Sequence, residues 1–244
     1  MKKLIFNQQL NMKQRTCALL FFLSLFLASN ALADIFEAGV YAAKKGNYKK
    51  ALPFINTAVN EGNPMAQVFL GLMYKNGKGV EQNPGEAFRL FELAAKQEDA
   101  DGQFNLGSLY DNGIGVVQDR KEAVKWYELS ANQGFIDAQL RLGLMYQYGQ
   151  GVTQSYNESE KWYHMAAEQG DADAQLMLGL ANWSGQGVKQ NSIKAYMWTN
   201  IAASNGSHEA IEYKTKMNKK LSPKETQQAL ELSRTCKANS YKDC

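Results

Sequence analysis

Residues 101–116 read DGQFNLGSLYDNGIGV, residues 137–152 read DAQLRLGLMYQYGQGV and residues 173–188 read DAQLMLGLANWSGQGV. A further copy, MAQVFLGLMYKNGKGV, occupies residues 65–80, so the segment returns every 36 residues. Repeats of this length are typical of solenoids, in which each unit packs mainly on its neighbours and the stack presents a long continuous face. The period therefore favours a binding protein.

Each unit has the pattern of two helices joined by a glycine turn. In the second unit an apolar stripe at helical spacing predicts the first helix, formed by Leu106, Leu109 and Tyr110. Gly113 suits the end of this helix, because glycine adopts the left-handed conformation without a side-chain clash. A second helix is expected from about Arg120 to Gly134, with Trp126 and Tyr127 on its inner face.

Helix starts follow the same period. N-cap residues are expected at Asn63, Asp99, Asp171 and Ser207, whereas Phe135 breaks the series. Near the end of the chain, Ser222-Pro223-Lys224-Glu225 has the form of a capping box, and a closing helix to about Arg234 should follow.

The pattern A-x-x-x-L-G-x-x-Y, then G-x-G-V, then A-x-x-W-Y-x-x-A-A-x-x-G recurs between Ala66 and Gly206. In these residues the chain resembles the Sel-one-like repeat family, a relative of the tetratricopeptide solenoids. The resemblance implies an all-α fold, a right-handed α-α superhelix (solenoid) of about four to five antiparallel helix pairs with a C-terminal capping helix. The fourth unit departs most, since Asn182 replaces the tyrosine and Thr199 the aromatic beside Trp198.

The period and the ends of the chain predict its domain organisation. A short helical pair at 34–62 should turn at Gly46-Asn47-Tyr48. Its second helix should place Ala51, Ile55 and Ala58 in register with the second helix of each later repeat. The expected segments are a signal peptide at 1–33, an N-terminal capping helix pair at 34–62, repeats at 63–98, 99–134, 135–170 and 171–206, and C-terminal capping helices with a disulfide tail at 207–244.

The first 33 residues have the form of a secretory signal. Basic residues precede an apolar run from Ala18 to Leu27, and Ala31-Leu32-Ala33 supplies a small-x-small cleavage pattern. The run is shorter than the roughly 20 residues that span a bilayer, so a retained anchor is the weaker alternative. We therefore expect a bacterial protein that is periplasmic or secreted, without stable membrane insertion.

Removing this segment changes the charge of the chain. The 27 basic residues become 23 once Lys2, Lys3, Lys13 and Arg15 are lost, against 24 acidic ones. A near-neutral protein lacks the basic footprint of nucleic-acid binding.

Two cysteines remain after cleavage, Cys236 and Cys244. Eight positions apart in an exported chain, they are expected to form a disulfide that folds back the tail after the last helix. A metal pair is the alternative, but His164 and His208 each stand alone, so no metal or other cofactor is expected.

Motifs for catalysis are weak. The glycine pairs follow helices rather than strands, so they suit helix ends better than phosphate loops. Cysteine-rich members of the family that the chain resembles are connected with β-lactams, yet no serine here has a lysine three residues later, and the paired cysteines of each repeat are missing. We expect no enzyme; an envelope enzyme acting on a β-lactam or peptidoglycan is the alternative.

Specificity should reside in first-helix positions that differ between units. By resemblance to tetratricopeptide units, these positions line the concave groove and suit another protein or peptide as partner. The predicted partner-binding residues are Lys75, Phe104, Asp111, Gln147, Tyr148 and Trp183. The expected function is an adaptor or scaffold in the cell envelope, monomeric and binding protein rather than nucleic acid; a secreted host-interaction factor is the other alternative.

Overall fold

The computed structural model describes residues 34–242 and residue 244, and within this part every regular element is a helix. The predicted signal peptide at 1–33 lies outside the described residues. None of the described helices is both long and apolar enough to cross a bilayer. The described part divides into two compact units between Leu90 and Phe91, and this boundary falls inside a helix.

The N-terminal unit contains a helical segment at 34–44, α2 (Tyr48–Asn60), α3 (Pro64–Asn76) and the first half of α4 (Pro84–Lys96). The expected turn is present at Gly46, whose φ is 76°. Ala51, Ile55 and Ala58 are buried in α2, as predicted. The core of this unit gathers Ile55, Leu70, Met73 and Leu90, so the capping pair and the first repeat share one apolar cluster.

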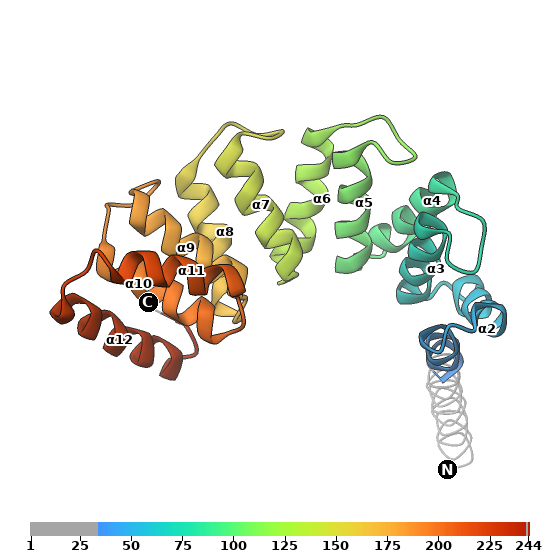
Figure 1. The fold of residues 1–244 in the computed structure, drawn as a ribbon. Coiled ribbons are helices and arrows are strands. Elements are labelled where there is room, and N and C mark those ends of the chain that lie inside the picture. Colours follow the sequence, from blue (N-terminus) through green and yellow to red (C-terminus); the bar gives the residue numbers. More distant parts are fainter. Residues whose placement is uncertain (1–33, 243) are drawn as a thin grey trace, which may run out of the picture. The chain divides into compact units, whose positions relative to one another are not determined.

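The C-terminal unit repeats one helix pair three times. Helices α5 to α10 each have 13 residues and pack on their neighbours along the chain, from α5 on α6 to α9 on α10 (Figure 1). The predicted all-α repeat fold is therefore confirmed. The helices are α5 (Ala100–Asn112), α6 (Arg120–Asn132), α7 (Ile136–Tyr148), α8 (Tyr156–Glu168), α9 (Ala172–Ser184), α10 (Ser192–Ser204), α11 (His208–Asn218) and α12 (Pro223–Ala238).

Helix ends follow the predicted signals. The N-cap side chains of Asn63, Asp99, Asp171 and Ser207 each accept a backbone N–H three residues ahead, while Phe135 makes no such bond. At the other end of α7, Gly149 donates its N–H to the Met145 carbonyl. Its φ of 67° is left-handed, a conformation that a residue with a side chain adopts only with strain. At these positions the local sequence therefore sets where the helix begins or ends.

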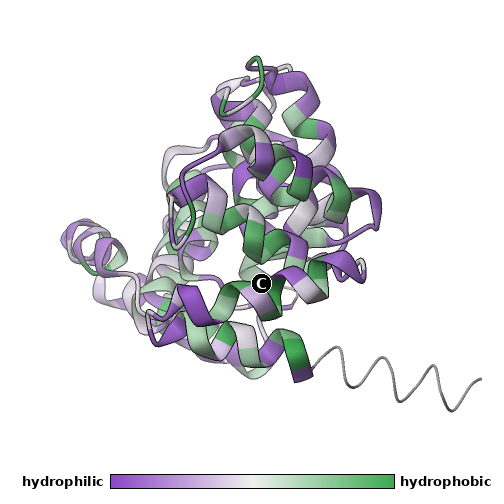
Figure 2. Ribbon diagram, turned by 90° about the vertical axis from the view of Figure 1, so that its right-hand side faces the viewer, coloured by the Kyte–Doolittle hydropathy of each residue, from purple (hydrophilic) through white to green (hydrophobic). Residues whose placement is uncertain are grey.

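The glycine of the Leu-Gly signature permits close packing within a pair. A Cβ atom on Gly143 would lie 2.4 Å from Cε1 of Tyr163, which is itself 3% exposed. Hydrophobic and hydrophilic residues are interspersed along the visible helices (Figure 2), whereas α10 is buried on most of its sides. In an amphipathic helix such as α2, one face packs on the neighbouring helix while the other meets water.

Amide side chains join successive repeats. Gln133 Nε2 donates to Gln103 Oε1 at 2.8 Å, and one period later Gln169 Nε2 donates to Gln139 Oε1 at 2.9 Å. The acceptor glutamines are almost fully buried, so each bond satisfies a polar group that would otherwise be costly to enclose. This amide ladder repeats with the same period as the helices.

The last rung of the amide ladder is completed by the tail. Asn205 Nδ2 donates to Gln175 Oε1 at 2.9 Å and to the Tyr241 hydroxyl at 3.0 Å. Gln169 instead gives its second bond to the Gly134 carbonyl, at 3.0 Å. Asparagine is one methylene shorter, and here Tyr241 takes the place of that carbonyl as the second partner.

The final helix is longer than predicted. The capping box between Ser222 and Glu225 is confirmed, but α12 continues past Arg234 to Ala238, so Cys236 lies within the helix rather than after it. Cys236 forms a disulfide with Cys244, with the two Cα atoms 5.4 Å apart. The disulfide turns the tail back, Tyr241 and Cys244 pack against the cluster that holds Met197 and Trp198 of α10, and α12 also packs on α10.

Candidate functional site

The predicted site residues fall into different surroundings. Lys75 lies near the end of α3 in the N-terminal unit, is half-buried, and its carbonyl accepts a hydrogen bond from Gln82 Nε2 at 2.9 Å. The other five lie in the C-terminal unit. Lys75 therefore belongs to a different unit from the other five, and each unit is considered by itself.

Asp111 ties two repeats together. Its side chain is only 1% exposed and pairs with Arg141 of α7, whose Nε lies 2.8 Å from Oδ2. Arg120 Nε lies 3.5 Å from the other carboxylate oxygen. A buried carboxylate needs such cations, because an unpaired charge in the interior is costly. Asp111 thus contributes to the packing of α5 on its neighbours.

Phe104 and Trp183 also take part in packing. The Phe104 ring lies 5.5 Å from the Tyr127 ring and 5.1 Å from the Phe135 ring, measured between centroids. Trp183 packs against the cluster that contains Tyr196 and Met217. Lys220 Nζ sits 5.6 Å from the Trp183 ring centroid, within cation–π range.

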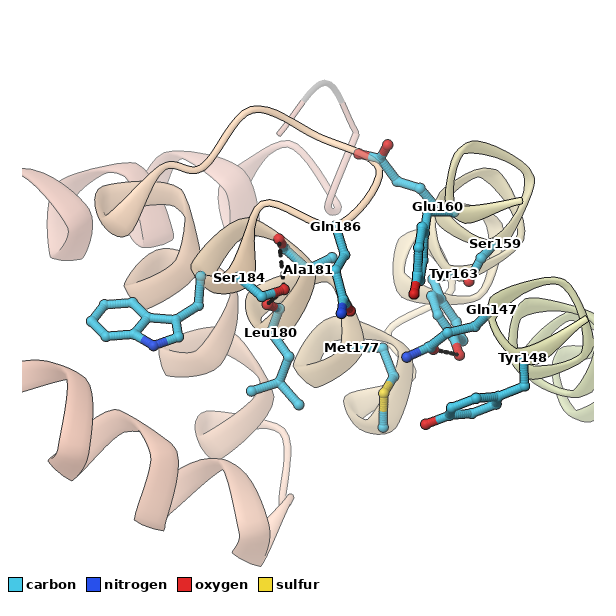
Figure 3. A pocket seen from close by; sticks show the side chains of 12 residues that line it. Gln147, Tyr148, Ser159, Glu160, Tyr163, Met177, Leu180, Ala181, Ser184 and Gln186 are labelled. Carbon is cyan, nitrogen blue, oxygen red and sulfur yellow. Dashed lines mark hydrogen bonds between the residues drawn. The ribbon is translucent and has the colours of Figure 1, made fainter. Parts of the chain in front are cut away.

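Gln147, Tyr148 and Trp183 gather around one cavity of about 310 Å³, which we call the inter-repeat groove. Figure 3 shows the ring of Tyr148 pointing across it toward Met177. Tyr148 is 63% exposed, unusually open for a large aromatic side chain. The groove is lined by Gln147 and Tyr148 of α7, by Tyr156, Ser159, Glu160 and Tyr163 of α8, by Met177, Leu180, Ala181, Trp183 and Ser184 of α9, and by Gln186 of the following loop.

Hydrogen bonds hold the polar wall of the groove in place. The Tyr163 hydroxyl donates to Gln147 Oε1 at 2.8 Å, and Ser159 donates to the Gly143 carbonyl at 2.7 Å. Burial raises the pKa of Tyr163 well above its usual value, so this phenol stays protonated and keeps donating. The amide nitrogen of Gln147 is thereby turned into the groove, where it can donate to a ligand (Figure 3).

The chemistry of the groove suits an extended polypeptide. Apolar groups such as Met177 and Leu180 line the groove together with amides, hydroxyls and one carboxylate, Glu160. This mixture matches alternate side chains and backbone groups of a peptide. Among the described residues no group of three or more His, Cys, Asp or Glu side chains is placed to hold a metal ion.

The sequence prediction missed the contribution of α8, because it considered only first-helix positions. Tyr163 lies one period after Tyr127, which the sequence places on the inner face of its helix, so the repeat gives no sign that Tyr163 borders a groove. Glu160 carried a signal that was overlooked: the equivalent positions hold Phe88, Val124 and Tyr196. A carboxylate at a position that is apolar in the other repeats indicates that this position faces a more polar environment in the third repeat.

Comparison with known proteins now adds to this geometry. A family model described as the Sel1 repeat matches residues 64–99, 100–135, 136–171 and 172–207. The chain is similar to the crystal structure of a Sel1 repeat protein from Oxalobacter formigenes, with 31% identity and a TM-score of 0.71, covering 84% of this chain and 85% of that one.

A second similar structure is c5321, a protective antigen present in uropathogenic Escherichia coli strains that displays an SLR fold. It shares 29% identity with a TM-score of 0.74, covering 88% of this chain but 48% of that one. This chain thus spans about half the length of c5321. Among proteins with curated descriptions, none matches.

Proposed function

The chain belongs to the Sel1 repeat family, and from this membership we propose that it is an exported adaptor that binds another protein through the inter-repeat groove. Sel1 repeats generally mediate contacts between proteins. The observation that carries the proposal is the groove itself, where exposed Tyr148 stands beside a Gln147 amide oriented by Tyr163.

Tyr148 has the properties of a binding anchor. A tyrosine ring supplies a large contact area at a small cost in side-chain entropy, and aromatic anchors carry much of the energy of protein interfaces. In this proposal Gln147, Tyr148 and Trp183 contact the partner, whereas Phe104 and Asp111 hold the repeats together. Lys75 belongs to the N-terminal unit and is not assigned to the groove.

Export to the bacterial envelope is part of the proposal. Its support is the signal-like sequence at 1–33 and the disulfide between Cys236 and Cys244, since disulfides persist in oxidising compartments. We propose a monomer that acts without catalysis. This agrees with the typical role of Sel1 repeat proteins as scaffolds.

A capture experiment tests the adaptor role. The full exported chain is used to recover proteins from envelope extracts, with Tyr148→Ala as the groove variant and Tyr41→Ala as the matched control, because Tyr41 is similarly exposed at 66%. The groove variant should weaken binding of the recovered protein by about tenfold or more, and the control should leave it unchanged. Equal binding by both variants would remove the groove from the proposal.

A second candidate is a factor that faces a host or neighbouring cell. It is favoured by the similarity to c5321, which is described as a protective antigen. Fractionation separates the two: an adaptor stays in the envelope, while a secreted factor accumulates outside the cell.

A further inference from the structure

A cavity of about 290 Å³ in the N-terminal unit lies in the same register of the repeat as the inter-repeat groove, and we call it the N-terminal groove. Six of its lining residues stand three periods of 36 residues before residues that line the inter-repeat groove. These six are Tyr48, Phe69, Leu72, Met73, Asn76 and Lys78, and they correspond in order to Tyr156, Met177, Leu180, Ala181, Ser184 and Gln186. The repeat therefore forms a groove at the same register in both units.

The edge of each groove is built in the same way. A glycine of the G-x-G-V turn lies against the tyrosine that begins the second helix of the preceding pair, and both glycines have a φ of 77°. A Cβ atom on Gly79 would lie 2.2 Å from Cβ of Tyr48, and one on Gly187 would lie 2.8 Å from Cβ of Tyr156. The two grooves therefore share a backbone frame and differ in the side chains that line them.

In the third repeat the chain itself engages the side chains at two of these positions. Arg141 takes the position of Phe69, and Arg120 takes that of Tyr48. Both arginines pair with Asp111, Arg141 through Nε at 2.8 Å from Oδ2 and Arg120 through Nε at 3.5 Å from Oδ1. The aromatic side chains at these positions in the N-terminal groove leave its lining without such an internal ion pair.

The N-terminal groove is basic, in contrast to the inter-repeat groove. Lys44 and Lys78 are the charged residues of its lining, whereas Glu160 is the charged residue of the inter-repeat groove. The surrounding sequence has the same bias, because residues 38–60 and 62–80 together hold six lysines and no aspartate or glutamate. A ligand of this groove should therefore be acidic.

The two lysines are available to a ligand. Both are exposed, and within the described residues neither of their side chains has an ion-pair partner. Elsewhere in the stack lysines pair along their own helix, as Lys125 does with Glu122 at 2.6 Å. The ammonium groups at the N-terminal groove thus remain free to donate to carboxylates.

The floor of the N-terminal groove is apolar. Phe69 and Leu72 are half-buried, and Met73 is almost fully buried. The Phe69 ring is held by an edge-on contact with the Phe36 ring, whose centroid lies 6.2 Å away. An apolar side chain of a ligand can therefore pack on Phe69 and Leu72 while acidic groups beside it reach the lysines.

We propose that the N-terminal groove is a second binding site, and that it takes an acidic polypeptide segment that carries an apolar side chain. The inference goes beyond the inter-repeat groove and rests on the proposed function only in taking a polypeptide as the ligand. Charge complementarity with Lys44 and Lys78 selects acidic residues, and the floor selects the apolar side chain between them. A cavity of this size admits single side chains, which favours a peptide over the flat surface of an anionic bilayer.

The first test uses peptide probes on the full exported chain. The acidic probe is acetyl-Glu-Leu-Glu-Leu-Glu-amide, and its uncharged match has glutamine in place of each glutamate. Binding is followed by NMR through the methyl groups of Leu72. The acidic probe should bind about tenfold more tightly than the glutamine probe, and added salt should reduce this preference. Absence of binding, or equal binding of the two probes, would overturn the proposal.

Variants locate the probe. Lys44→Gln and Lys78→Gln together should remove most of the preference for the acidic probe. Lys49→Gln and Lys50→Gln together are the matched control: they change the net charge equally in the same unit without lining the groove, and should alter binding less than about twofold. Leu72→Ser, which introduces the residue found at Ser108, should weaken both probes. If Leu72→Ser does not fold, the lysine variants still decide, and equal losses in the two pairs would contradict a site at the groove.

Vesicles test the other source of negative charge. They contain equal parts of phosphatidylglycerol and phosphatidylcholine, with phosphatidylcholine alone as the control. Sedimentation with the anionic vesicles that requires Lys44 and Lys78, together with no preference between the peptides, would assign these lysines to a membrane surface and overturn the proposal. A peptide preference without vesicle binding supports it.

The two proposals fail separately. If capture recovers a partner that depends on Tyr148 but the acidic probe is not preferred, the second site is wrong and the adaptor proposal stands. If the acidic probe binds through Lys44 and Lys78 but no partner depends on Tyr148, the adaptor proposal for the inter-repeat groove fails and the N-terminal groove stands.

Discussion

Gly143→Ala should destabilise the third repeat although alanine is the better helix former. The added Cβ would lie 2.4 Å from Cε1, 2.6 Å from Cδ1 and 2.9 Å from Cζ of Tyr163. Comfortable carbon contacts lie at about 3.5 to 4.0 Å. The Tyr163 ring has little room to retreat, because it is 3% exposed and its hydroxyl is bonded to Gln147.

The size of the effect is the balance of two terms. Overpacking a filled site costs about 1 to 3 kcal/mol, and the upper value applies here because the overlap exceeds 1 Å against a buried ring. Replacing a helical glycine by alanine stabilises the helix by about 1 kcal/mol, which offsets part of this cost. The free energy of unfolding should therefore fall by about 2 kcal/mol, which lowers the melting temperature by roughly 4 to 8 °C for a chain of this size.

Thermal and urea unfolding measure this change, with Gly85→Ala as the matched control. Gly85 is also helical, but a Cβ there would meet only Asn83 Oδ1 at 3.4 Å, so this variant should be neutral or slightly more stable. If Gly143→Ala unfolds at or above the temperature of the parent chain, the signature glycine is not needed for the approach of Tyr163, and the packing described for each pair is wrong.

The remaining predictions concern charge, protonation and the tail. Asp111→Asn leaves Arg141 without its carboxylate and should cost about 2 to 3 kcal/mol in urea unfolding, while Glu122→Gln, at an exposed pair with Lys125, should change it by less than about 0.5 kcal/mol. Burial raises the pKa of Tyr127 to about 12, so the folded chain retains a proton that the unfolded chain loses near pH 10. Stability followed by circular dichroism should therefore decline as the pH rises from about 10 toward 12, and a stability that is flat across this range would contradict the burial of Tyr127. Replacing Cys236 and Cys244 by serine should cost about 2 to 3 kcal/mol for so short a loop, and a reductant should lower the melting temperature of the parent chain but not of this variant.

Much of the fold was predictable because its signals are local. Asn63 and Asp99 begin helices through their own side chains, and Gly149 ends one through its own backbone, so the sequence identifies these boundaries without knowledge of distant contacts. The 36-residue spacing then implies that each unit repeats the same pair. The length of α12 was underestimated, because nothing in the local sequence after Arg234 shows that Cys236 packs inside the last cluster.

The candidate site was only partly predictable, because its residues depend on contacts between repeats. Asp111 occupies a variable position that suggested a surface role, yet Arg141, 30 residues away, pairs with it in the interior. Gln147 and Tyr148 were predicted because both are first-helix positions that differ between units, whereas Glu160 and Gln186 reach the groove from other elements. A single sequence shows which positions vary but not which of them share a cavity.

The adaptor role is tested most directly by site-specific photocrosslinking in the producing cell. A benzophenone amino acid replaces Tyr148 in one chain and Tyr41 in another, both otherwise full length, and adducts are identified by mass spectrometry. We expect one defined protein to be crosslinked from position 148 and not from position 41. No adduct at position 148, or the same adducts from both positions, would contradict binding through the inter-repeat groove.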